Sequence, residues 1–131
     1  MKIPVTIRFA DTDAMGHVNN AFFLSYLELA RAKHFMKYRH TPKDPFDFNF
    51  ILAHLEIDYI KPIELFDDIY VEIWVSKIGN SSWEYSYEIK DSRNSEIIYA
   101  KAKSVQVLYD YNKKHSILIP PDLKKILLEK S

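Results

Sequence analysis

Cysteine is absent from this sequence and glycine is scarce, with only Gly16 and Gly79 among 131 residues. At an average usage near 7%, a chain of this length would hold about nine glycines. Without cysteine there is no disulfide framework, no thiolate zinc site and no catalytic thiol. Two isolated glycines cannot form the glycine-rich loops that bind dinucleotides or nucleotide phosphates. Several large enzyme classes are excluded on these grounds alone.

The chain also lacks an excess of charge of one sign and a long apolar run. Its 18 Lys and Arg balance 18 Asp and Glu, so no net field attracts nucleic acid or an anionic membrane. No apolar run approaches the roughly 18 residues of a membrane-spanning helix. Residues 1–5 carry a lysine and a proline where a signal peptide needs an apolar core. We therefore expect a cytoplasmic protein with no nucleic-acid partner and no membrane partner.

Apolar side chains are plentiful, at 47% of residues, which is enough for the core of one domain spanning residues 1–131. Residues 3–9 alternate between apolar and polar types, which predicts a half-buried strand whose inner face carries Ile3, Val5, Ile7 and Phe9. Residues 21–39 contain neither glycine nor proline and predict a long helix.

The second half of the chain predicts four strands followed by a short helix that begins near Pro120. The strand-like runs cover residues 50–60, 69–78, 83–90 and 97–109. This order of elements is typical of an α+β protein with an antiparallel sheet. The long helix is apolar on nearly all sides over residues 21–27, so it needs more cover than one flat sheet provides. Either the sheet curls around the helix or another subunit covers it.

The side chains best suited to chemistry gather in residues 11–20, between the first strand and the long helix. Asp11 and Asp13 point in opposite directions if the backbone is extended, so one of them is expected to face a site. Asn19 or Asn20 marks the helix N-terminus, whose N–H groups can polarise a carbonyl oxygen. A carboxylate beside that carbonyl can act as a general base or as a nucleophile. The same residue types also suit a structural Asx-turn and a helix cap.

Metal-dependent and serine-dependent catalysis find little support in the sequence. The five histidines, at positions 17, 34, 40, 54 and 115, include no pair with the spacing of a helical zinc site. No serine stands in a G-x-S-x-G turn. We expect neither a metal site nor a cofactor.

Residues 7–31 form one long pattern, Ile7-Arg8-Phe9-x-Asp11-Thr12-Asp13-x-x-Gly16-His17-Val18-Asn19-Asn20-x-x-Phe23-x-x-Tyr26-x-Glu28-x-Ala30-Arg31. This pattern resembles the signature of hot-dog-fold acyl-CoA thioesterases of the 4-hydroxybenzoyl-CoA thioesterase/YbgC-like family. The resemblance implies an antiparallel five- to six-stranded sheet wrapped around one long central helix. It also implies hydrolysis of an acyl-CoA substrate to a free acid and CoA, at the interface of a homodimer or of a dimer of dimers (a homotetramer).

The resemblance assigns roles within the loop. Asp13 takes the position of the catalytic carboxylate, as general base or nucleophile, and Asp11 is structural. Asn20 supplies the backbone N–H that polarises the thioester carbonyl. Gly16 allows a close approach to the substrate or a positive φ. His17 either positions substrate or water, or packs to fix the turn.

Substrate-binding residues are expected beside this loop and on outer turns, at Asn19, Ser81, Ser82 and Lys61. The two serines lie in the turn that the family uses near the CoA arm. Further cations that could meet the CoA phosphates are Lys77, Arg93, Lys101 and Lys103. The aromatic residues that line either the acyl pocket or the core are Phe22, Phe46, Phe48, Phe50 and Tyr59.

Two other interpretations of the sequence stay open. A hot-dog hydratase or dehydratase would use Asp13 and His17 on a hydroxyacyl thioester, and would hydrate an enoyl thioester without releasing CoA. A non-catalytic acyl-CoA-binding module would bind tightly without turnover. On the helix itself, Glu28 and Arg31 are spaced for an ion pair.

Overall fold

The computed structural model describes residues 1–38 and 50–129. Its strands are β1 (Lys2–Val5), β2 (Phe50–Tyr59), β3 (Ile69–Ile78), β4 (Ser82–Asp91), β5 (Ile98–Asp110) and β6 (His115–Ser116). Its helices are α1 (Asn20–Phe35), α2 (Pro121–Leu128) and the short 3-10 helix η1 (Phe9–Asp11).

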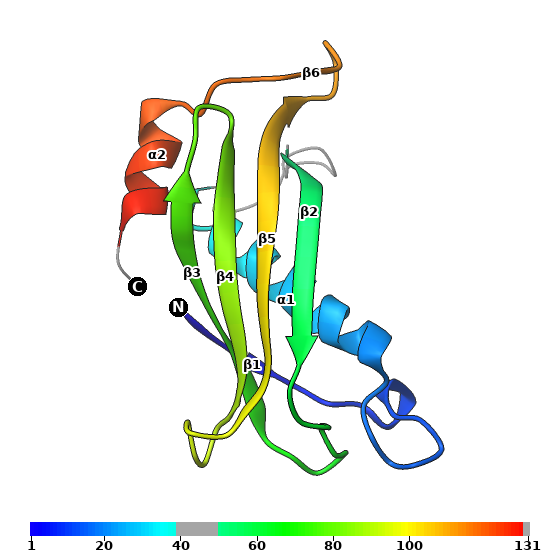
Figure 1. The fold of residues 1–131 in the computed structure, drawn as a ribbon. Coiled ribbons are helices and arrows are strands. Elements are labelled where there is room, and N and C mark those ends of the chain that lie inside the picture. The colour runs from blue at the N-terminus through cyan, green and yellow to red at the C-terminus, as the bar shows by residue number, and fades with distance from the viewer. Residues whose placement is uncertain (39–49, 130–131) are drawn as a thin grey trace.

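One antiparallel sheet curves over the long helix α1 (Figure 1). The main strands run in the order β1-β3-β4-β5-β2, and β6 pairs with the end of β5. The predicted α+β class is confirmed, and the arrangement is the hot-dog fold. Loop residues 41–48, with Phe46 and Phe48, lie outside the described residues.

The core lies between α1 and the inner face of the sheet. Strand β4 shows why the sheet forms, because its alternation sends Trp83, Tyr85, Tyr87 and Ile89 inward, where all four are buried. From the helix, Phe23, Leu27 and Ala30 meet them at helical spacing. The predicted runs over the last three long strands match β3, β4 and β5 to within one residue at each end.

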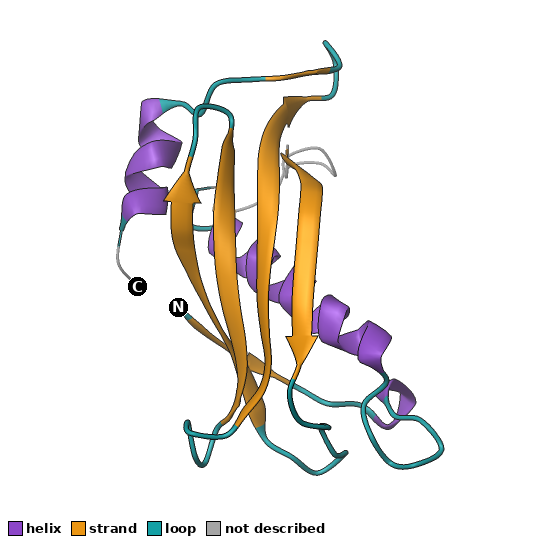
Figure 2. Cartoon of the chain, viewed as in Figure 1, coloured by secondary structure: helices purple, strands orange, loops and turns teal. Residues whose placement is uncertain are grey.

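Helix α1 ends at Phe35, four residues before the predicted end at residue 39. The chain continues with tighter turns of the 3-10 type, because the amides of Lys37 and Tyr38 donate to carbonyls only three residues back, at 3.1 and 2.9 Å. Helix α2 lies beside the part of β3 that follows its pairing with β1 (Figure 2). Neither described helix is long and apolar enough to cross a membrane.

The first strand is shorter than predicted, and the expectation for Phe9 is wrong. Ile3 and Val5 are buried as expected, but β1 ends at Val5, and Phe9 is 80% exposed. The chain leaves the sheet because residues 9–11 turn into η1, with the Asp11 amide donating to the Arg8 carbonyl at 2.9 Å. Alternation of residue types cannot reveal this turn.

The predicted ion pair between Glu28 and Arg31 is also wrong for the described chain. Arg31 is only 6% exposed and points into the core, where it donates to the Tyr87 hydroxyl at 3.3 Å. Glu28 lies on the exposed side of α1. Helical spacing brings the two Cα positions near each other, but the Arg31 guanidinium bonds to Tyr87 in the core and not to Glu28.

Candidate active site

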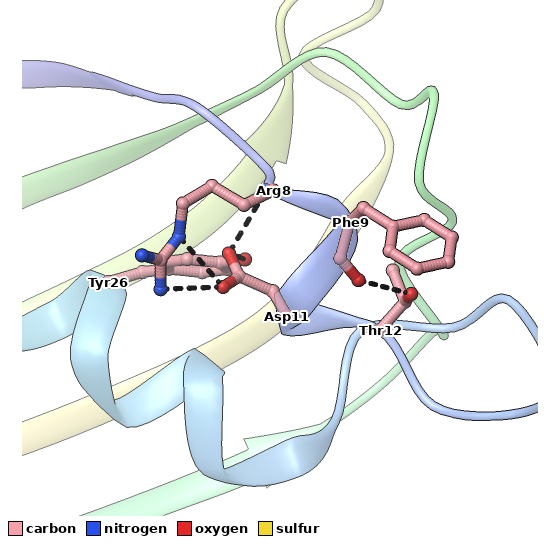
Figure 3. A network of polar contacts seen from close by, with 5 residues as sticks. All are labelled: Arg8, Phe9, Asp11, Thr12 and Tyr26. Atoms are coloured by element: carbon pink, nitrogen blue, oxygen red, sulfur yellow. Dashed lines mark hydrogen bonds and ion pairs between the residues drawn. The ribbon is translucent and has the colours of Figure 1, made fainter.

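An ion pair between the exposed Arg8 and the buried Asp11 fixes the start of the loop between β1 and α1. Asp11 is 1% exposed, and its carboxylate accepts from the Arg8 guanidinium at 2.9 and 3.1 Å and from the Tyr26 hydroxyl at 2.8 Å (Figure 3). Burial alone would raise the pKa of Asp11, but the hydrogen bonds from Tyr26 and Arg8 outweigh it and hold the pKa below its usual value. Asp11 is thus an ionised anchor that ties the loop to α1.

The loop beyond Asp11 is a tight turn closed by its own backbone. The Asp13 amide donates to the His17 carbonyl at 2.8 Å, and Gly16 donates back to the Asp13 carbonyl at 3.1 Å. Gly16 has a φ of +78°, which confirms the predicted positive φ. A short bridge from His17 to Glu64 places this turn against the segment between β2 and β3.

Asp13 is exposed, and its two carboxylate oxygens differ. Oδ1 accepts from the amides of Met15 at 2.8 Å and His17 at 3.2 Å, which is an Asx-turn. Within the described chain, Oδ2 makes no hydrogen bond. The structural interpretation of Asp13 therefore applies to one oxygen, while the other stays available for chemistry.

The N-terminus of α1 points a backbone donor at the same place. The Asn19 side chain caps the helix by accepting from the Ala21 amide at 3.0 Å, so Asn19 is the N-cap and Asn20 is the first helical residue. The Asn20 amide has no partner among the described residues. Such helix-terminal N–H groups can polarise a carbonyl oxygen. The Asn19 amide oxygen serves the cap, which leaves less of that side chain for the predicted contact to substrate.

A cavity of about 290 Å³ brings these groups together. Its lining includes Asp13, His17, Asn20, Phe23, Tyr59 and Lys61. Tyr59 closes one side, because its hydroxyl donates to the Asn20 carbonyl at 3.2 Å and its ring meets Phe23 edge to face. Lys61 is held with its ammonium 5.8 Å from the centre of the Tyr99 ring.

The structure does not bring Ser81 and Ser82 to this cavity within one chain. Ser82 pairs with Val107 of β5, whereas Tyr59 pairs with Ala100. The seven residues of β5 between these positions place the serines about 24 Å away along the sheet. They lie at the opposite end of the strands from the Asp13 loop (Figure 1).

Sequence reasoning missed the contribution of the chain just after β2. Ile60 and Pro62 line the cavity on either side of Lys61. The Lys61-Pro62 break was visible as a strand end, but not its position against the loop, which depends on the amide of Val18 donating to the Ile63 carbonyl at 2.7 Å. A larger cavity of about 900 Å³ lies between β3 and α2. It contains none of the predicted catalytic residues, although Lys77, one of the candidate cations for the CoA phosphates, is part of its lining.

Comparison with known proteins now decides the family. A family model described as the thioesterase-like superfamily matches residues 7–127. The chain belongs to this superfamily. It is therefore a thioester hydrolase, and the match spans the whole path from the Asp13 loop through α2.

Individual relatives agree with this assignment. The acyl-CoA thioesterase YbgC of Haemophilus influenzae is 27% identical over 124 residues, covering 92% of this chain and 89% of that protein. A solved thioesterase from Thermus thermophilus, complexed with coenzyme A and Zn, is 32% identical with a TM-score of 0.82, covering 96% of this chain and 90% of that one. The uncharacterised YsmA of Bacillus subtilis is 26% identical over 83 residues, or 63% of this chain and 56% of that protein.

The Thermus structure holds zinc as well as coenzyme A. No group of three or more His, Asp or Glu side chains suited to a metal occurs in residues 1–38 and 50–129.

Proposed function

We propose that this protein hydrolyses acyl-CoA thioesters to a free acid and CoA in the cavity beside Asp13. One observation carries the proposal: Asp13 and Asn20 line the same cavity, and among the described residues neither Oδ2 of Asp13 nor the Asn20 amide has a hydrogen-bond partner. A thioester carbonyl placed between them would be polarised on one side and attacked on the other.

The reaction needs two groups from this chain. The Asn20 N–H donates to the carbonyl oxygen and stabilises the negative charge that develops there. Asp13 either takes a proton from a water that attacks the carbonyl carbon, or attacks it directly and forms an anhydride that water then hydrolyses. In both routes the carbon–sulfur bond breaks and CoA leaves as a thiolate, which is protonated in solution.

In this proposal, the neighbouring residues orient Asp13 and bind the substrate but take no part in breaking the thioester bond. His17 donates its backbone N–H to Asp13 and so fixes the orientation of the carboxylate, and its side chain lines the cavity. Gly16 allows the turn that makes this bond possible. Lys61, which is part of the cavity lining, carries a positive charge that suits a CoA phosphate.

We further propose that the site is completed in a homodimer. The inner face of β2 is only partly covered by α1, and Leu24, Leu52 and Tyr59 are 36%, 45% and 44% exposed. A second copy against this edge would cover the apolar side of α1 that the sheet leaves open, and would bring further groups toward the cavity. Assembly into a tetramer, a single-domain organisation and a cytoplasmic location stay predictions.

Substitution of Asp13 tests the proposal. Asp13→Asn removes the basic oxygen but keeps the shape of the side chain, so kcat/KM for acyl-CoA hydrolysis should fall by about 10² to 10⁴. A panel of acyl-CoAs with a thiol reagent measures CoA release. Because Asp13 is exposed, the free energy of unfolding should change by less than about 0.5 kcal/mol.

The matched control is Asp11→Asn, two positions away. It removes the charge of a buried carboxylate that accepts from Arg8 and Tyr26, and should cost about 2 kcal/mol of stability, with the Asp13 carboxylate still in place. Hydrolysis by Asp13→Asn at the wild-type rate would refute the assignment. Hydration of an enoyl thioester without CoA release would favour the hydratase instead.

A further inference from the structure

The larger cavity, between β3 and α2, has an apolar lining that is partly exposed. Its apolar side chains include Trp74, Val75, Ile78, Leu127 and Leu128. Trp74 is 39% exposed and Leu128 is 63% exposed, although both are large and apolar. The volume of about 900 Å³ lies in the range of pockets that hold small organic molecules. A ligand that covers these side chains would remove apolar surface from water.

The acidic residues of this cavity already have partners within the chain. They are Glu72, Glu88 and Glu129, and each lies within ion-pair distance of a lysine outside the lining. Lys90 lies 2.9 Å from Glu72 and 3.9 Å from Glu88, and Lys37 lies 3.9 Å from Glu129. The negative charge of the cavity is therefore compensated.

The two lysines of the lining, Lys77 on β3 and Lys124 on α2, have no such partner. Among the described residues, no carboxylate lies within 4.0 Å of either ammonium. Glu84, which is opposite Lys77 in the pairing of β3 with β4, instead accepts from the Ser76 hydroxyl at 2.7 Å. The uncompensated charge of the cavity is therefore positive, and an anionic ligand would accept charge-assisted hydrogen bonds from these lysines.

The open edge of β3 in this cavity is poorly suited to an added peptide strand. Strand β1 pairs with β3 as far as Glu72, and Met1 exchanges hydrogen bonds with Ile73. Beyond this point, the register of β3 shifts between Val75 and Lys77. Such an irregularity breaks the even spacing of edge N–H and C=O groups that a peptide strand needs. A flexible alkyl chain has no such requirement.

The proposed dimer leaves this cavity open. In the sheet order β1-β3-β4-β5-β2, the β2 edge that we expect to meet a second copy lies three strands from β3, whereas α2 lies on the β3 side (Figure 1). The cavity shares no lining residue with the one beside Asp13. The two cavities could therefore be occupied at the same time.

We propose that the cavity between β3 and α2 binds the anion of a fatty acid. The alkyl chain lies against Trp74 and Leu128, and the carboxylate binds at Lys77 and Lys124. Such a carboxylate is ionised at neutral pH and supplies the negative charge that the two lysines lack. The inference goes beyond the proposed hydrolysis, because it concerns a second cavity and is tested by binding alone.

Dodecanoate, titrated into the full chain below its micelle concentration, is the probe. The sequence has two tryptophans, and Trp83 is buried whereas Trp74 lines the cavity, so intrinsic fluorescence reports on this site. The signal should change saturably, with a Kd of about 10 to 100 μM. Dodecyltrimethylammonium has the same alkyl length and the opposite charge, and should bind about tenfold more weakly or worse. In Trp74→Phe the fluorescence response should be lost while calorimetry still detects binding.

Lysine variants locate the ligand. Lys77→Met and Lys124→Met each remove one charge from an exposed position, so the chain should fold and the Kd for dodecanoate should rise by about three- to tenfold. Lys125→Met is the matched control, because Lys125 follows Lys124 on α2 but is not part of the lining, and the Kd should stay unchanged. Asp13→Asn should also leave the Kd unchanged, whereas a fatty acid bound beside Asp13 would bind more tightly without that charge.

Three results would overturn the inference: no saturable binding of dodecanoate, equal affinity for the cationic amphiphile, or the same Kd in the Lys77 and Lys124 variants as in Lys125→Met. A Kd that changes in Asp13→Asn but not in the lysine variants would place the ligand in the other cavity and would also overturn it. None of these results bears on the hydrolysis of acyl-CoAs, and a protein that hydrolyses none could still bind dodecanoate, so the two proposals fail separately.

Discussion

Asp11 and Asp13 are identical side chains separated by one residue, and their surroundings give them opposite tasks. Asp11 is buried and all of its bonding serves the fold, through Arg8 and Tyr26. Asp13 uses one oxygen in the turn and keeps the other exposed. Asp11 therefore holds the loop, and Asp13 keeps one oxygen for the chemistry that we propose.

Gly16 is the residue at which backbone freedom matters most. A Cβ at this position would meet nothing within 4 Å, so any cost of substitution comes from its φ of +78° and not from a clash. Gly16→Val should strain the turn by about 1–2 kcal/mol and displace Asp13, lowering kcat/KM by tenfold or more. The midpoint of thermal unfolding should fall by only a few degrees.

Gly16→Asn provides the matched comparison, because asparagine tolerates the left-handed region far better than valine. It should keep most of the activity. Equal losses in the two variants, or a loss of folding as large as the loss of activity, would mean that Gly16 serves the turn and not the position of Asp13. Activity on an acyl-CoA and the unfolding midpoint are measured on the same samples.

At the scale of elements, α1 carries a polar group that its packing keeps neutral. His34 is 2% exposed, and its Nδ1 lies 2.8 Å from the Tyr85 hydroxyl. Burial, helped by the charge of Lys37, lowers the pKa of His34 to about 4. The helix can therefore bury a titratable residue against the sheet at neutral pH.

This shift makes stability depend on pH in a defined window. The unfolded chain binds a proton at His34 below about pH 6.5, whereas the folded chain resists it down to about pH 4. Stability from this group is complete above pH 6.5 and falls as the pH drops, by up to about 1.4 kcal/mol per unit. Urea unfolding at pH 7, 6 and 5 should show this slope in the wild type.

His34→Gln should lose most of that slope, because glutamine does not titrate. His115→Gln should keep it, since His115 is exposed. The same dependence on pH in the wild type and in His34→Gln would show that the proton uptake belongs to another group.

The elements themselves were largely predictable, and the reason is local. Strands β3 and β4 alternate along their length, Lys101 and Lys103 mark the outer face of β5, and turn residues separate the three, so each could be placed from its own sequence. The predictions were wrong where contacts beyond the local residue pattern determine the structure. These positions are Phe9, which is exposed, and Arg31, which is buried. For the site, residue types identified the Asp13 loop, but only the fold shows that Tyr59 and Pro62 complete the cavity and that Ser82 does not.

At the scale of the whole molecule, the exposed inner face of β2 predicts a dimer. Light scattering coupled to size exclusion should give twice the chain mass of 15.5 kDa. Leu52→Glu places a charge on the 45% exposed Leu52 and should shift the protein toward monomer, with loss of activity if the site needs both copies.

Leu118→Glu is the matched control, because Leu118 is 73% exposed and lies outside β2 and α1. It should leave the mass unchanged. A wild-type protein that is monomeric and fully active would contradict the dimer and show that one chain holds a complete site.

The pairing of β1 with β3 has a consequence for the order in which the protein folds. Lys2 pairs with Glu72, so the strand that precedes the Asp13 loop cannot dock until a segment about 70 residues later has been made. Contacts so distant in sequence form late, because closing a long loop costs chain entropy. The strands β3, β4 and β5 are adjacent both in sequence and in the sheet, so they can pair first, and β1 then pairs with the free edge of β3. The Asp13 loop is thus expected among the last features to form, and a nascent chain gains a structured core before it gains the proposed active site.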